Sequence, residues 1–159
     1  MFKSDNINVL MSLTGGYTTN IHLDSINYKE VAKGILVGGN LSTILSLLGT
    51  EYMPDFKDKI LFIEDAFTSP QKFNRDIETL KQNKILYQIN GIIIGTFFGV
   101  DMNQSCFEKI LNEYIDKPMI YNVNFGHSNP IMTIPIGISA EIDSNKPRIT
   151  LLESPFKST

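Results

Sequence analysis

Ile60-Leu61-Phe62-Ile63-Glu64-Asp65 is the segment that indicates the class of fold most clearly. Four apolar residues in a row, ended by two carboxylates, are typical of a buried strand that runs into a polar loop. In α/β proteins the loops beyond the strand ends carry the reactive groups. Glu64 and Asp65 are therefore the first candidates for a functional site.

A second polar loop, Asn124-Phe125-Gly126-His127-Ser128-Asn129-Pro130, follows a short strand predicted from Pro118 to Val123. An imidazole and a carboxylate brought together are two of the three members of a nucleophilic triad. Glu64 and Asp65 compete for the carboxylate role, because successive strand residues face opposite sides of a sheet. Only one of them can then reach His127, and for Asp65 a helix cap or a surface charge is the alternative.

Helices and strands alternate along the rest of the sequence. Leucine and isoleucine recur at helical spacing over residues 41–48, which predicts a helix opened by Asn40 and stopped by Gly49. Residues 21–34 show no clean period. The same reasoning predicts further helices over 70–80, capped by Ser69, and over 107–114, and further strands over 7–13 and 91–97.

The last part of the sequence has a different pattern. Extended runs at 132–142 and 148–152 flank a polar turn at 143–147, which is typical of an antiparallel hairpin. Alternating strands and helices followed by a hairpin predict the α/β class with a mixed sheet.

Composition excludes several classes of partner. The 159 residues are 42% hydrophobic and 19% charged with a net charge of −3, as in an ordinary globular domain. Without a Lys/Arg cluster, neither nucleic acid nor a membrane surface is an expected partner. The single Cys106 excludes an internal disulfide, and the two histidines with scattered carboxylates predict no metal site and no cofactor. No leader or long apolar run stands out, so we expect a cytoplasmic protein.

Six runs between Lys33 and Glu153 carry a family resemblance: residues 34–41, 48–56, 59–65, 91–95, 124–130 and 133–137. In this order they resemble the LD-carboxypeptidase and microcin C immunity family of serine peptidases. The resemblance covers the C-terminal domain of that family almost entirely. It implies a swivelling β/β/α fold in which helices accompany a mixed sheet with a C-terminal β-hairpin.

The beginning of the chain resembles a different part of the family. Residues 9–20 are similar to the Gly-Gly-Tyr strand and loop of the N-terminal domain. In the family a Gly-Tyr-Ser-Asp nucleophile elbow follows, whereas here Tyr28-Lys29-Glu30 leads almost directly to Lys33. We therefore expect residues 1–30 to be a remnant of the N-terminal nucleophile domain, and residues 31–159 to be the C-terminal domain. A chain that starts late and has a large internal deletion would explain this arrangement.

The resemblance also implies roles for individual residues. His127 would be the general base, and Glu64 would orient the imidazole and stabilise the imidazolium. Gly15 and Gly16 are candidates for binding an oxyanion through backbone N–H groups, and Asn40 for contacting a polar substrate. A plain turn and a helix cap are the respective alternatives.

The nucleophilic serine is the member that the sequence does not provide. No serine or threonine stands in an elbow of the Gly-x-Ser-x-Gly type. We expect no substitute among the hydroxyls nearest the glycine turn or at the start of the first helix, which are Ser12, Thr14, Thr18, Thr19 and Ser42.

Two functions follow. The resemblance implies a serine peptidase scaffold that hydrolyses an amide at the C-terminal end of a cell-wall tetrapeptide or of a peptide–nucleotide toxin. A muropeptide or peptide–nucleotide small molecule is then the expected substrate. The alternative is a catalytically inactive remnant that at most binds a ligand. The choice of amide substrate stays open, as does a homodimer through the helix face at 41–48 or the C-terminal hairpin.

Overall fold

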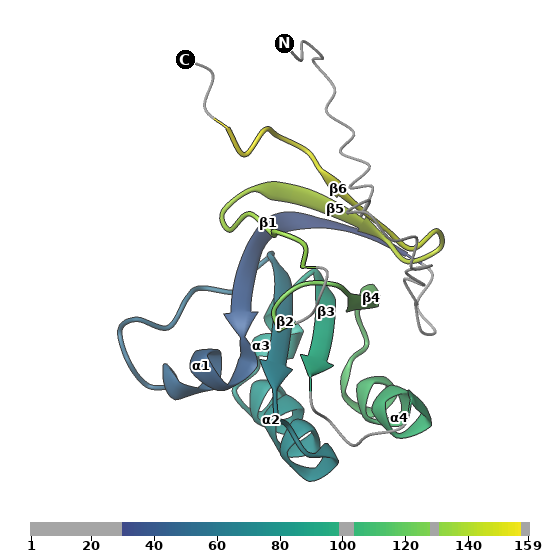
Figure 1. Cartoon of the computed structure of the whole chain (residues 1–159). Coiled ribbons are helices and arrows are strands. Elements are labelled where there is room, and N and C mark those ends of the chain that lie inside the picture. Colours follow the sequence, from purple (N-terminus) through teal and green to yellow (C-terminus); the bar gives the residue numbers. More distant parts are fainter. Residues whose placement is uncertain (1–29, 99–103, 128–130, 157–159) are drawn as a thin grey trace.

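The fold is that of a computed structural model, which describes residues 30–98, 104–127 and 131–156. Strands and helices alternate along these residues up to a terminal pair of strands (Figure 1). The elements are β1 (Val31–Asn40), α1 (Leu41–Ser46), β2 (Ile60–Ala66), α2 (Pro70–Gln82), α3 (Ile85–Gln88), β3 (Gly91–Phe98), α4 (Gln104–Tyr114), β4 (Met119–Val123), β5 (Ser139–Asp143) and β6 (Arg148–Leu151).

The strands form one six-stranded sheet in the order β4-β3-β2-β1-β5-β6. β1 to β4 pair in parallel, whereas β5 runs antiparallel to β1 and β6 runs antiparallel to β5. The mixed α/β sheet with a C-terminal hairpin, expected from the sequence, is therefore confirmed.

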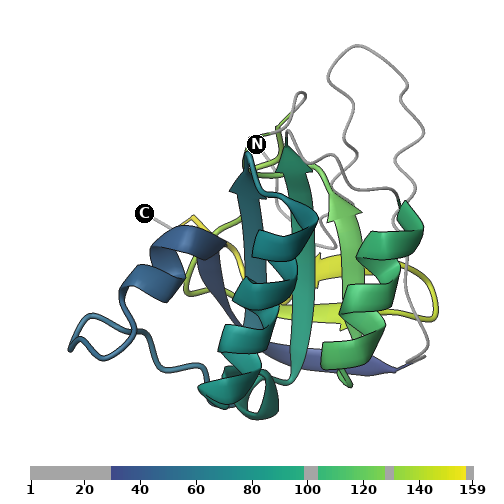
Figure 2. The same ribbon diagram turned by 90° about the horizontal axis from the view of Figure 1, so that it is seen from below.

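β1 joins two halves of the sheet. Residues 31–35 of this strand pair with β5, and residues 36–40 pair with β2. The strand curves between the two halves, and the β5–β6 hairpin lies across one end of the parallel strands (Figure 1). The helices α2 and α4 lie together on one face of the parallel strands, as seen from below in Figure 2.

The sheet thus separates two apolar cores, and β2 contributes to both. Leu61 and Ile63 pack in the core under the helices, whereas Ile60 and Phe62 pack in the core under the hairpin. These four side chains are at most 5% exposed. Burying each one contributes about 1.5–3 kcal/mol to folding, so β2 is firmly anchored from both sides. A well-anchored strand is a rigid base for the two carboxylates that follow it.

β1 is the main element that the sequence analysis missed. Its signal is weak because Gly34, Gly38 and Gly39 interrupt the apolar pattern, and glycine is disfavoured in strands. Two of these glycines are needed for close packing. A Cβ atom on Gly34 would lie 2.8 Å from the Asp58 carbonyl oxygen, and one on Gly38 would lie 2.7 Å from the carbonyl carbon of Phe62.

Two element bounds also differ from expectation. The first arm of the hairpin begins at Ser139 rather than at Met132, because Pro135 has no N–H for a strand ladder and Gly137 turns the chain with φ +83°. The first helix ends at Ser46, two residues earlier than expected. The N-cap at Ser69 is confirmed, since its side chain accepts a hydrogen bond from the Lys72 backbone N–H. The strand expected over residues 7–13 lies outside the described residues.

Candidate functional site

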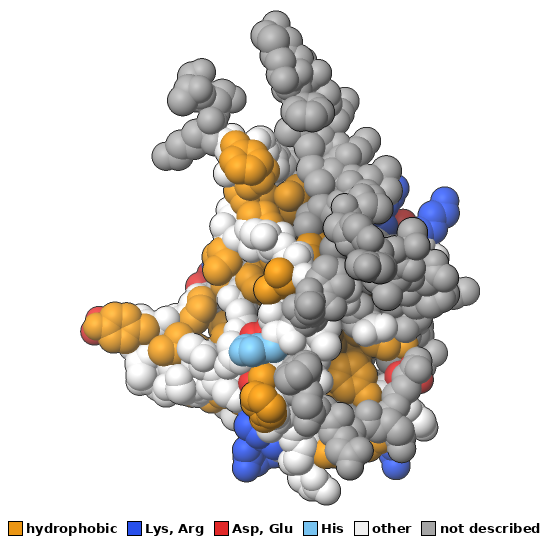
Figure 3. Space-filling model, in the orientation of Figure 1, with side chains coloured by type: hydrophobic (Ala, Val, Ile, Leu, Met, Phe, Trp, Pro, Cys, Tyr) orange, Lys and Arg blue, Asp and Glu red, His pale blue; other side chains and the backbone are white. Residues whose placement is uncertain are grey.

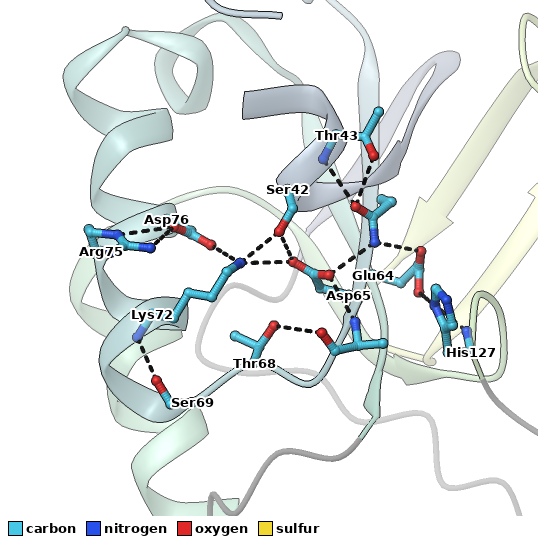
Figure 4. Close-up of polar contacts among 12 residues, drawn as sticks. Ser42, Thr43, Glu64, Asp65, Thr68, Ser69, Lys72, Arg75, Asp76 and His127 are labelled. Atoms are coloured by element: carbon cyan, nitrogen blue, oxygen red, sulfur yellow. Dashed lines mark hydrogen bonds and ion pairs between the residues drawn. The ribbon is translucent and has the colours of Figure 1, made fainter. Parts of the chain in front are cut away.

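Glu64 and His127 meet at the end of β2. His127 follows β4 in the loop after Gly126, and its Nδ1 lies 2.8 Å from Glu64 Oε2. The His127 backbone N–H also donates to Glu64 Oε2, at 3.2 Å. The imidazole lies at the molecular surface with 54% of its side chain exposed, whereas the Glu64 side chain is 8% exposed (Figure 3). A buried carboxylate therefore holds one side of an accessible imidazole (Figure 4).

The contact fixes the chemistry available to His127. An ionised carboxylate only accepts hydrogen bonds, so Nδ1 carries the proton and Nε2 is left to accept one. The hydrogen bond that His127 donates to Glu64, together with the negative charge of Glu64, raises the pKa of His127 above the ordinary value of histidine. This is the arrangement of a general base whose protonated form is stabilised by a carboxylate.

Replacing Glu64 with glutamine is expected to lower the pKa of His127 toward the ordinary value, because the charge that stabilises the imidazolium is lost. The pair stabilises the folded chain below the unfolded pKa of His127, and this contribution disappears as the pH rises through the raised pKa. An NMR titration of the ring carbons measures the shift. Glu141→Gln is the control, because Glu141 pairs with Lys33 instead. An unchanged pKa in Glu64→Gln would contradict the assignment.

Asp65 points to the other side of β2, so the expectation that only one carboxylate reaches His127 holds in the structure. Its Oδ2 accepts from Ser42 Oγ at 2.5 Å and from Lys72 Nζ at 3.1 Å. Burial opposes ionisation of this carboxyl, but hydrogen bonds from Ser42, Asn40, Lys72 and the Ala66 backbone outweigh it and lower its pKa. Asp65 is 4% exposed, and Asn40 and Ser69 are the N-caps of α1 and α2, so the alternative of a surface charge or a helix cap for Asp65 was wrong.

Asn40 connects the two carboxylates. Its Nδ2 donates to Glu64 Oε1 at 3.3 Å and to Asp65 Oδ1 at 3.0 Å. Its Oδ1 accepts from the backbone N–H of Thr43 at 3.0 Å and so caps α1. The structure thus shows the helix cap that was the alternative for this residue, and both amide protons are engaged. Substrate contact by Asn40 stays a prediction.

Ser42 lies in the same network as Asp65 and Lys72. Its Oγ donates to Asp65 and accepts from Lys72 Nζ at 2.7 Å. Burial lowers the pKa of Lys72, but the carboxylates of Asp76 and Asp65 outweigh it and raise that pKa. Lys72 is therefore an ammonium group that cannot take the proton of Ser42. This favours a structural role for Ser42, as expected, over that of a nucleophile.

The sequence analysis did not single out Lys72 or Asp76. Lys72 Nζ lies 2.5 Å from Asp76 Oδ2, one helical turn along α2. The i,i+4 spacing of these charges was the available signal, together with the apolar neighbours Phe73 and Ile77 that place Asp76 toward the core. Gly15 and Gly16, and the candidate hydroxyls of the glycine turn, lie outside the described residues.

Within the ranges that the structure describes, no three His, Cys, Asp or Glu side chains come together as metal ligands. In the same ranges no helix is long and apolar enough to cross a membrane. Cys106 is partly exposed on α4.

Comparison with known proteins gives consistent matches. Residues 33–142 match the LD-carboxypeptidase C-terminal domain. The microcin C7 self-immunity protein MccF of Escherichia coli is 30% identical over 127 residues, which are 76% of this chain and 37% of that protein. Solved structures of MccF include a complex with glutamyl sulfamoyl guanosine, with a TM-score of 0.75 and 25% identity over 86% of this chain and 42% of that one.

Two further solved structures have the same fold. The MccF-like protein of Bacillus anthracis is similar with a TM-score of 0.76 and 35% identity, over 83% of this chain and 43% of that one. The muramoyltetrapeptide carboxypeptidase of Oxalobacter formigenes has a TM-score of 0.71 and 27% identity, over 81% of this chain and 47% of that one. The chain therefore spans less than half the length of these relatives.

Proposed function

We propose that this chain, which belongs to the LD-carboxypeptidase C-terminal domain family, provides the general base of a serine-type carboxypeptidase site and the carboxylate that orients it. The observation that carries the proposal is the contact between His127 Nδ1 and Glu64 Oε2, which leaves an exposed imidazole with Nε2 ready to accept a proton. The domain boundaries expected from the sequence, 1–30 and 31–159, are part of this proposal.

The chemistry follows from this geometry. His127 Nε2 would take the proton of a serine hydroxyl as the serine oxygen attacks the amide carbonyl carbon. Glu64 would stabilise the imidazolium until His127 returns the proton to the leaving amine. The serine is the member that we propose this chain to lack, since none of its serines stands in an elbow motif.

The substrate is proposed from the relatives. One relative is named a muramoyltetrapeptide carboxypeptidase, and MccF is a microcin C7 self-immunity protein with a structure in complex with glutamyl sulfamoyl guanosine. We propose a small-molecule amide of one of these kinds, either the C-terminal amide of a cell-wall tetrapeptide or that of a peptide–nucleotide. The cytoplasm is the proposed location.

The test is release of D-alanine from an L,D-tetrapeptide, measured by mass spectrometry. We expect none from the cooperatively folded chain alone. We expect release from a chimera in which residues 33–142 replace the matching domain of the Oxalobacter formigenes muramoyltetrapeptide carboxypeptidase. In the chimera, His127→Ala should lower kcat by roughly 10⁶-fold and Glu64→Ala by roughly 10⁴-fold, the losses typical of a triad base and its carboxylate.

Each result separates the possibilities. Glu141→Ala in the chimera is the matched control and should leave release unchanged, because Glu141 lies on β5 and pairs with Lys33. Undiminished release by His127→Ala would overturn the role of His127. Release by the chain alone would mean that a substitute nucleophile exists.

A second function, an inactive binding module, is favoured by the serines of the sequence. None of them stands in an elbow motif, so binding without hydrolysis is the expected behaviour of the chain alone. A muropeptide should then raise the melting temperature without being consumed. No shift at millimolar ligand would count against binding.

A further inference from the structure

We propose that Lys72 is a positioning residue for the Glu64–His127 pair and acts on it through Asp65 and Asn40. The inference deepens the proposed function, because the importance of holding Glu64 rests on its role beside His127. Lys72 lies on α2, on the far side of β2 from the imidazole, so its effect on the pair must pass through the residues between them (Figure 4).

The connection consists of consecutive side-chain contacts. Lys72 Nζ lies 3.1 Å from Asp65 Oδ2, and Asp65 Oδ1 accepts from Asn40 Nδ2 at 3.0 Å. The same Nδ2 donates to Glu64 Oε1 at 3.3 Å, and Glu64 Oε2 contacts His127 Nδ1 at 2.8 Å. Glu64 and Asp65 thus each accept a hydrogen bond from Asn40 with one carboxylate oxygen. The other oxygen contacts the His127 imidazole in Glu64 and the Lys72 ammonium group in Asp65.

The Lys72 end of this series and its middle member, Asn40, are held in place. The Asp65 and Asp76 side chains are each 6% exposed, and Lys72 bridges them from α2 to the end of β2. Asn40 is fixed from its other side, because its Oδ1 accepts from the N–H and the hydroxyl of Thr43 at the start of α1. The orientation of the Asn40 amide, and with it the rotamer of Glu64, therefore depends on the position of the Asp65 carboxylate.

Removing Lys72 distinguishes a positioning role from a direct charge effect, because the two would shift the pKa of His127 in opposite directions. A positive charge near the imidazole disfavours protonation, so losing that charge through space alone would raise the pKa of His127. Loss of the fixed Glu64 carboxylate would lower it instead. The charged groups that act on His127 from the packed elements are the carboxylates of Glu64 and, more weakly, Asp65.

The experiment is an NMR titration of His127 in the full chain, in a His22→Gln background that leaves one imidazole. In Lys72→Met we expect the pKa of His127 to fall toward the ordinary value. Arg75→Met is the matched control, because Arg75 is also on α2 and contacts Asp76 but not Asp65. It removes the same charge and should leave the titration unchanged. Lys72→Arg, which keeps the charge and the donors, should restore most of the wild-type pKa.

Lys72→Met leaves the buried Asp65 carboxylate without its cation and leaves Asp76 with Arg75 alone, and this change can unfold the chain. The double variant Lys72→Met/Asp76→Asn relieves one of them and still removes the cation from Asp65, so it gives the same test in a folded protein. An unchanged or raised pKa of His127 in the folded variant would overturn the positioning role. The measurement needs no turnover, so its failure is distinct from failure of the chimera to release D-alanine.

Discussion

Gly38→Ala is expected to destabilise the folded chain by roughly 2–6 kcal/mol, the sum of backbone strain and a steric clash. Gly38 has φ +153°, a conformation that residues with a side chain rarely adopt. Its Cβ would collide with the carbonyl oxygen of Phe62 and lie 2.8 Å from the Phe62 nitrogen. Because Gly38 and Phe62 are register partners in the parallel ladder of β1 and β2, neither backbone can move away without breaking the sheet. A loss of this size is a large part of the stability of a typical domain.

Gly39 provides the matched control for this prediction. It has nearly the same backbone conformation, with φ +151°, but a Cβ atom there would have no neighbour within 4 Å. Gly39→Ala should therefore cost only the strain, about 1–3 kcal/mol. Urea unfolding followed by circular dichroism measures both variants, and their difference reports the close approach of β1 to β2. Equal losses would contradict the steric argument.

The same glycines explain why part of the fold could be predicted and part could not. β2 and β3 each contain an unbroken apolar run, 60–63 in β2 and 92–94 in β3, so burial on both faces is visible in the sequence itself. β1 is longer but contains three glycines, two of which are required by the backbone of a neighbouring strand or loop. A local pattern carries no information about such a distant neighbour, so the central strand of the sheet was missed.

The candidate site divides in the same way. The meeting of Glu64 with His127 was predictable, because the ends of parallel strands lie at one edge of the sheet and their loops converge there. The environment of Asp65 was not, since its cation comes from α2 and its hydroxyl donor from α1. The family resemblance favoured Glu64 as the partner of His127, and strand alternation predicted only that the two carboxylates face opposite sides of the sheet. Alternation does not indicate whether Asp65 faces solvent or a helix that carries a lysine.

Gly126→Ala is expected to disconnect Glu64 from His127 while the fold survives. A Cβ on Gly126 would collide with the carboxylate and the Cγ of Glu64. Unlike the obstacle at Gly38, this one is a side chain that can rotate, so the clash can be relieved without opening the sheet. Rotation would remove Glu64 from its contacts with the His127 ring and backbone and with Asn40. The pKa of His127 should then fall toward its ordinary value, as in Glu64→Gln.

Gly137→Ala separates this effect from backbone strain. Gly137 has φ +83°, almost the same as the +84° of Gly126, and its Cβ would have no neighbour within 4 Å. Both variants should lose about 1–3 kcal/mol in thermal or urea unfolding, because the strain is similar. Only Gly126→Ala should change the NMR titration of His127, and only this variant should abolish release by the chimera. If Gly126→Ala instead loses much more stability and keeps the pKa of His127, the loop has moved rather than Glu64. The Glu64 carboxylate would then be held too firmly to rotate. The hydrogen bond from Asn40 to Glu64 would be the contact to test next.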